Sequence, residues 1–195
     1  MRVPAREFLG LRLAVHEALR GVPLRDVTVV DLPGGGPGRT ISEVRALFAK
    51  AVRGASAPAR ALFALRTALG RPLGWDSPSH SIESHRTESF VSRVPPEIAQ
   101  RSLVAPGTIE DGWLVLYVLE REAVTELRNA TVHAFLSLAL VERPGGWRVY
   151  VAVYVRPVSR WTPLYMAAIE PFRRFVVYPA VARRLVRDWR DRYRC

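Results

Sequence analysis

Residues 132–157 decide the fold and read VHAFLSLALVERPGGWRVYVAVYVRP. Residues alternate in character on both sides of RPGG (143–146), and this four-residue segment is rich in the residues that form turns. Such a pattern predicts a β-hairpin. Placing Glu142 opposite Trp147 then fixes the register of both strands, because a shift by one residue would exchange the two faces.

In this register the hairpin has one apolar and one semi-polar face. The apolar face pairs Leu140 with Val149, Leu138 with Val151, Leu136 with Val153 and Ala134 with Val155. The semi-polar face pairs Ala139 with Tyr150, Ser137 with Ala152, Phe135 with Tyr154 and His133 with Arg156. Another element must cover the apolar face. The pattern leaves open whether the semi-polar face meets solvent or a cavity.

The remaining chain predicts further strands and helices. A β-branched run predicts a strand over 26–32, and alternation predicts strands over 86–94, 103–105, 113–119 and 124–142, the last with a break near Asn129. We expect an amphipathic helix over 4–20 and a helical hairpin over 41–53 and 56–70. Thr40 and Glu43 have the spacing of a capping box at the start of that hairpin.

The C-terminal segment predicts the cover for the apolar face. From Pro171 onward, apolar residues recur every three or four positions with arginines between them, which is typical of an amphipathic helix. We expect a kink at Pro179, which lacks a backbone donor. The predicted fold is therefore α+β: a curved antiparallel sheet of about six to seven strands, a helical hairpin, a long C-terminal helix and an extra N-terminal helix.

Composition limits the classes of function. The 195 residues favour one domain, and the formal net charge of +11 comes almost entirely from arginines spread along the chain, with Lys50 the only lysine. We therefore expect no specific nucleic-acid partner. The single cysteine, Cys195, excludes an internal disulfide and fits the cytoplasm. No secretion signal and no apolar run of about 20 residues is present, so we expect no transmembrane segment.

The order of elements resembles the helix-grip fold of the START-like superfamily, which includes the birch-pollen-allergen and polyketide-cyclase types. Residues 164–179 (LYMAAIEPFRRFVVYP) and 64–69 (ALRTAL), followed by Leu73-Gly74, resemble the bacterial domain-of-unknown-function family 2867. The resemblance implies one START-like domain over 1–195, with 1–24 as a helical extension and 25–195 as a core around an apolar cavity. It implies no settled activity. At Arg173 the family often carries His, so we expect no proton transfer there.

Two motifs contain residue types that could bind a ligand. The glycine loop at 34–40 precedes a helix, but Pro33 and Arg39 replace residues that a phosphate-binding P-loop requires, so a connector is favoured. His80, Glu83, His85 and Glu88 could bind zinc, yet their spacing matches no standard site and a solvated loop is favoured. We expect no metal and no cofactor.

His133 is a weak catalytic candidate. It lies in mid-strand near Arg156, where a buried imidazole would stay neutral and could act as a base. The hairpin register sets no carboxylate or nucleophile beside it, so a packed strand histidine is the favoured interpretation.

The leading hypothesis is a non-catalytic binder of a hydrophobic or amphipathic small molecule, held between the sheet and the C-terminal helix. The predicted lining consists of a floor (Ala134, Leu136, Leu138, Val151, Val153), a lid (Phe172, Phe175, Val176) and two aromatic residues with polar tips (Tyr150, Tyr154). One alternative is a cyclase-type or hydrolase-type enzyme with His133 as base and Tyr150 or Tyr154 as donor. Another is a basic membrane-surface or nucleic-acid binder acting through the C-terminal helix. A homodimer stays open.

Overall fold

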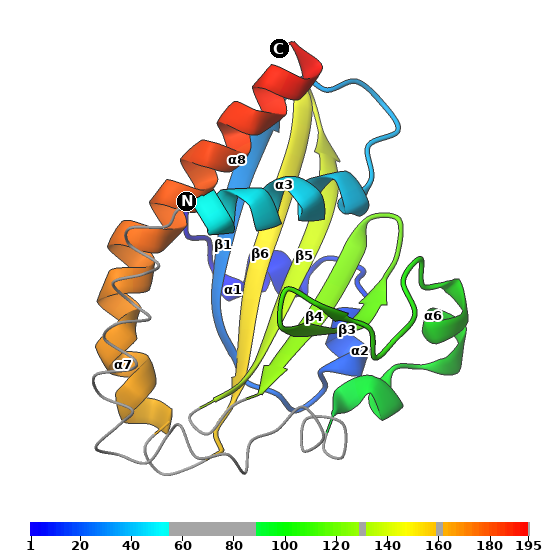
Figure 1. Cartoon of the computed structure of the whole chain (residues 1–195), viewed down its shortest axis with the longest axis vertical. Helices are drawn as coiled ribbons and strands as arrows, with labels where there is room; N and C mark the ends of the chain where they lie inside the picture. The colour runs from blue at the N-terminus through cyan, green and yellow to red at the C-terminus, as the bar shows by residue number, and fades with distance from the viewer. Residues whose placement is uncertain (55–88, 129–131, 159–161, 195) are drawn as a thin grey trace.

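The computed structural model describes residues 1–54, 89–128, 132–158 and 162–194. These residues include six antiparallel strands in one curved, unclosed sheet with the order β1-β6-β5-β4-β3-β2 (Figure 1). The strands are β1 (Leu24–Pro33), β2 (Ile109–Glu110), β3 (Trp113–Val118), β4 (Glu122–Arg128), β5 (His133–Arg143) and β6 (Gly146–Arg156). Together with a long C-terminal helix they form a helix-grip-like α+β fold, which confirms the predicted fold class.

The central hairpin of β5 and β6 has the predicted register. Glu142 pairs with Trp147, and every pair predicted for the two faces is present. Gly145 provides the turn with a φ of 79°, in the left-handed region that favours glycine. At Gly146 a Cβ atom would lie 2.3 Å from the carbonyl oxygen of Leu32, so only glycine lets β1 approach the start of β6.

Helices α3 (Ile41–Gly54) and α8 (Tyr178–Tyr193) cover the apolar face of the sheet. The core between them and the sheet is aliphatic apart from two tryptophans, and its members include Ile41, Val44, Leu138, Leu140, Val149, Val151, Val181, Leu185 and Trp189. The Glu43 carboxylate accepts a hydrogen bond of 2.9 Å from the backbone N–H of Thr40, which is the glutamate half of the predicted capping box at the start of α3.

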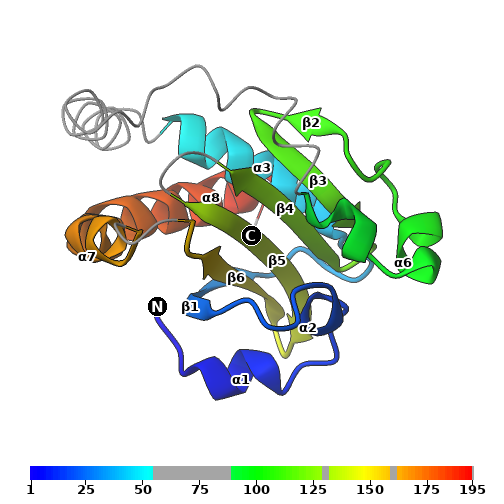
Figure 2. The ribbon, with the colours of Figure 1, turned by 90° about the horizontal axis from the view of Figure 1, so that it is seen from below.

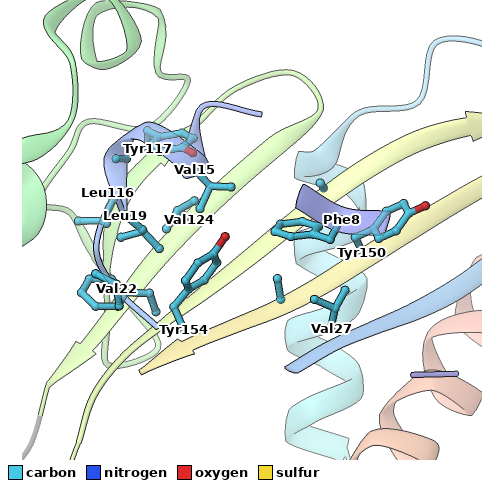
Figure 3. Packing of buried hydrophobic residues seen from close by; sticks show 14 of the residues in the cluster. Phe8, Val15, Leu19, Val22, Val27, Leu116, Tyr117, Val124, Tyr150 and Tyr154 are labelled. Atoms are coloured by element: carbon cyan, nitrogen blue, oxygen red, sulfur yellow. The ribbon is translucent and has the colours of Figure 1, made fainter. Parts of the chain in front are cut away.

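The N-terminal segment covers the opposite, semi-polar face through α1 (Ala5–Leu9) and α2 (Val15–Ala18) (Figure 2). Phe8 and Val15 are buried there beside Tyr150 and Tyr154 (Figure 3). The sequence left open whether the semi-polar face meets solvent or a cavity, and in the described residues it forms a second core. The prediction of one helix over 4–20 was wrong, since α1 ends at Leu9 and a separate short helix begins at Val15.

A buried carboxylate attaches this N-terminal segment to the sheet. The side chain of Glu122 is 5% exposed. It accepts hydrogen bonds from the backbone N–H groups of Ala14 at 2.9 Å and Val15 at 2.8 Å, and from the Tyr117 hydroxyl at 2.5 Å. A negative charge at the first amides of a helix is favourable, so Glu122 serves as the N-terminal cap of α2.

The C-terminal helix contains a wide turn. It runs as α7 (Thr162–Phe172), a π-helical turn η2 (Arg173–Val177) and α8. We expected the irregularity at Pro179, but it lies just upstream. Pro179 has no N–H to donate to the carbonyl of Phe175, and the π turn absorbs this missing α-helical hydrogen bond.

Several local predictions need correction or fall outside the described residues. Residues 90–93 form a 3-10 turn, η1 (Phe90–Arg93), and 103–105 are irregular, so neither is a strand. A short helix, α6 (Pro96–Arg101), follows two prolines and was not predicted. The helix over 56–70 and the cluster from His80 to Glu88 lie outside the described residues. Among the described helices, none combines the length and apolar character needed to cross a membrane.

Candidate functional site

A pocket of about 440 Å³ lies between β1 and the C-terminal helix. The sheet contributes Asp26 and Thr28, and the helix contributes an apolar wall that includes Phe175. Asp26 pairs with Val153 of β6 and Thr28 pairs with Val151. The pocket therefore lies on the same face of the sheet as the predicted floor, one strand farther out, beside β1. Figure 1 shows β1 at the edge of the sheet.

Asp26, Arg173 and Tyr178 form a hydrogen-bonded cluster in this pocket. Arg173 donates to Asp26 over 2.7 Å, Tyr178 donates to the other oxygen of Asp26 over 3.0 Å, and Arg173 also donates to the Tyr178 hydroxyl. The side chains of Asp26 and Arg173 are only 5% and 12% exposed. Both carboxylate oxygens and the phenol therefore have partners, and the cluster is a satisfied, fixed base for the pocket.

The π turn explains why these groups meet. Arg173 and Tyr178 are five residues apart, which in an α-helix would set them about 140° apart around the axis. A π-helical turn closes hydrogen bonds between residues five apart and brings such residues to nearly the same side. The turn at 173–177 thus directs both side chains toward Asp26 on β1.

The contacts within the cluster keep Arg173 charged and Tyr178 protonated. Burial alone would lower the pKa of the Arg173 guanidinium, but Tyr178 and Asp26 outweigh burial and raise that pKa. Burial raises the pKa of Tyr178 above its usual range. The base of the pocket therefore presents a permanent cation and a neutral phenol at physiological pH.

The predicted floor faces side chains of the helices. Leu138 and Val151 are buried in the α3 and α8 core, and Leu136 packs against that core while partly exposed. Ala134 and Val153 are half-buried against a small cluster that includes Met166 and Ile169 of α7. Helix α3 contacts β5 and helix α8 contacts β1, and the observed pocket lies at the β1 edge of this face.

The three predicted lid residues differ in their exposure. Phe172 is half-buried, Val176 is 36% exposed, and Phe175 is 68% exposed and lines the pocket. Phe175 is thus the member of the predicted lining that the pocket contains. A role in ligand binding for the other residues stays a prediction.

Tyr150 and Tyr154 lie on the opposite face, beneath the N-terminal segment (Figure 3). The Tyr150 hydroxyl donates to Glu7 over 2.8 Å. The Tyr154 hydroxyl and the buried Ser137 hydroxyl have no hydrogen-bond partner in the described part of the chain. Burial, and next the nearby Glu122 carboxylate, raise the pKa of Tyr154 to about 12.

His133 is 2% exposed on that same face, and a carboxylate does lie beside it. Its Nε2 atom is 2.5 Å from an oxygen of Glu126, whose other oxygen accepts a hydrogen bond of 2.7 Å from Ser89. The expectation of no neighbouring carboxylate was therefore wrong. That expectation considered only the hairpin of β5 and β6, whereas Glu126 belongs to β4, where Arg128 pairs with His133 and Glu126 is the diagonal neighbour.

Sequence patterns do not predict the cluster of Asp26, Arg173 and Tyr178. Asp26 begins a β-branched run and is indistinguishable by pattern from a surface acid at the end of a strand. Arg173 and Tyr178 do not share a face under α-helical periodicity. Only the position of Glu126 near His133 could have been predicted, by pairing the strands on either side of the expected break near Asn129.

The comparisons identify a family without adding an activity. Neither a curated protein nor a solved structure matches the chain. The family model described as "Protein of unknown function (DUF2867)" matches residues 18–180, a span that contains Asp26, Arg173 and Tyr178. Because this match covers well over half of the sequence, the chain belongs to the DUF2867 family.

Proposed function

We propose that this protein binds a small amphipathic molecule, without catalysis, in the pocket between β1 and the C-terminal helix. The observation that supports this most is the pocket itself, about 440 Å³ with a polar base and an apolar wall. Pockets for small molecules commonly enclose about 300 to 1,000 Å³ and combine apolar walls with a few fixed polar groups.

The apolar wall is suited to a hydrocarbon or ring surface. Phe175, Pro179 and Ala182 line one side of the pocket, and Phe175 is 68% exposed. Covering an exposed phenyl ring removes apolar area from water, which favours binding by about 25 cal/mol per Å² covered. The ligand would therefore place its apolar part against these three residues.

The polar base is suited to orienting a ligand. Asp26, Arg173 and Tyr178 satisfy one another, so they need no rearrangement before a ligand arrives. A fixed site loses less conformational entropy on binding than a mobile one. Thr28 on β1 adds a hydroxyl to the same wall.

Binding is favoured over the enzymatic alternative. Among the described residues that line the pocket, none is histidine or cysteine, and the tyrosine is already held by Asp26 and Arg173. His133 lies on the opposite face of the sheet from this pocket. The two carboxylates of the described lining, Asp26 and Glu170, are both paired with arginines, so neither is free to act as a general acid or base on a ligand.

A pocket-filling variant tests the proposal. Octan-1-ol, an uncharged amphipathic probe, is titrated into the purified protein by isothermal calorimetry, and the same titration is run on Ala182→Phe and on Ala167→Phe. Ala182 lines the pocket, whereas Ala167 is exposed on α7 outside it. We expect binding by the wild type and Ala167→Phe and its loss in Ala182→Phe. Equal binding by all three proteins would contradict the proposal.

A further inference from the structure

The charged residues that line the pocket are not balanced. Among the described lining residues, three arginines, Arg2, Arg173 and Arg174, face two carboxylates, Asp26 and Glu170. The wall that receives the ligand therefore carries an excess of positive side chains.

Both carboxylates already have partners. Asp26 holds Arg173 and Tyr178, as described above, with distances of 2.7 and 3.0 Å. Glu170 is 3.4 Å from Arg2. A cationic ligand would therefore have to displace an arginine before it reached either acid.

Arg174 is the described lining arginine that is not paired with either carboxylate. It is exposed, and within the described ranges no acidic group lies within ion-pair distance of it. Its guanidinium lies 5.2 Å from the centre of the Phe175 ring. A free cation thus stands directly beside the apolar surface that the ligand would cover.

Arg2 can bind an anionic group together with Arg174. The pair between Arg2 and Glu170 is long, at 3.4 Å, and its side chains are 46% and 40% exposed. Such surface pairs contribute little to stability, so Arg2 can exchange Glu170 for an anionic group on a ligand at small cost. Arginine forks bind carboxylate and phosphate oxygens well.

We infer that the ligand is an amphipathic anion whose acidic group binds Arg174, assisted by Arg2, while its apolar part covers Phe175, Pro179 and Ala182. This inference rests on the proposed function and adds the chemical class of the ligand. A neutral molecule of the same shape would gain the apolar contact but not the charged one.

The test compares two probes that differ in charge. Octanoate and octan-1-ol are titrated at pH 7 and low ionic strength into the wild type, Arg174→Gln and the control Arg187→Gln, whose arginine is exposed on α8 outside the pocket. We expect the wild type and the control to bind octanoate about fivefold more tightly than octan-1-ol, the effect of one solvent-exposed ion pair. In Arg174→Gln this preference disappears, because the affinity for octanoate falls to that for octan-1-ol.

The outcomes separate the two proposals. If both probes bind the wild type equally, or if the preference for octanoate survives in Arg174→Gln, the anion inference is overturned and the binding pocket stands. If neither probe binds the wild type, the proposed function fails and the inference fails with it. Raising the salt concentration should weaken only octanoate binding, because screening acts on the ion pair.

Discussion

Asp26→Ala tests whether the cluster at the base of the pocket holds the C-terminal helix on the sheet. The substitution removes the acceptor of two hydrogen bonds, from Arg173 at 2.7 Å and Tyr178 at 3.0 Å. It also leaves the Arg173 guanidinium without its carboxylate, in a position where that side chain is only 12% exposed. An unpaired charge in such a place is costly because little water reaches it and no counter-ion remains.

The expected loss follows from these contacts. Breaking a buried ion pair from one side typically costs about 3 to 5 kcal/mol, and water that enters through the pocket would keep this case near about 3 kcal/mol. For a chain of this length each kcal/mol shifts the melting temperature by about 2 to 4 °C, so we expect a decrease of about 6 to 12 °C. Urea denaturation followed by circular dichroism measures the free energy of unfolding, and calorimetry measures the melting temperature.

Asp31→Ala is the matched control on the same strand. Asp31 also pairs with an arginine, Arg148, at 2.6 Å, but its side chain is 65% exposed. The hydrogen bond from Arg148 holds the pKa of the Asp31 carboxyl below its usual range. Its contribution is therefore complete at pH 7 and is lost only as the pH falls through that lowered pKa. Since the pair is exposed, we expect the control to lose less than about 1 kcal/mol. Equal losses in the two variants would refute the argument from burial.

Three further substitutions test other parts of the fold. Tyr154→Phe should not lower the free energy of unfolding at pH 7. It should reduce the loss of stability between pH 10 and 12, because the folded protein favours the neutral phenol of Tyr154 up to a pKa of about 12. Urea titrations at several pH values measure both effects. Glu122→Gln should cost about 2 kcal/mol and speed amide hydrogen exchange in the N-terminal helices, whereas the exposed Glu120→Gln should do neither. Gly35→Ala should be clearly less stable than Gly36→Ala, since both glycines have positive φ but only the first would place a Cβ atom 2.6 Å from the tryptophan ring of α8; equal melting temperatures would contradict this.

The hairpin of β5 and β6 could be predicted residue by residue because its information is local. The alternation and the RPGG turn lie within 26 consecutive residues, and one pairing fixes all the others. The strand predicted over 86–94 was wrong where the structure describes it. Pro95 and Pro96 follow residues 90–93 and cannot donate ladder hydrogen bonds, and a 3-10 turn forms instead.

The pocket could not be predicted because its parts are distant in the sequence. Asp26 and Arg173 are 147 residues apart, and their meeting depends on a π turn that leaves no periodic pattern. The buried acids Glu122 and Glu126 were missed for a related reason. Charged residues are normally exposed, so alternation assigns them to solvent unless the partner that satisfies them is already known.

The most direct test of the binding proposal is a map of where a ligand contacts the chain. Backbone amide chemical shifts are recorded by heteronuclear NMR while octanoate is added to the uniformly labelled protein. We expect the largest changes at Thr28, Arg174, Phe175 and Ala182, which line the pocket beside β1. Changes confined to the β5 strand around Leu136, or no saturable change at any residue, would contradict the account.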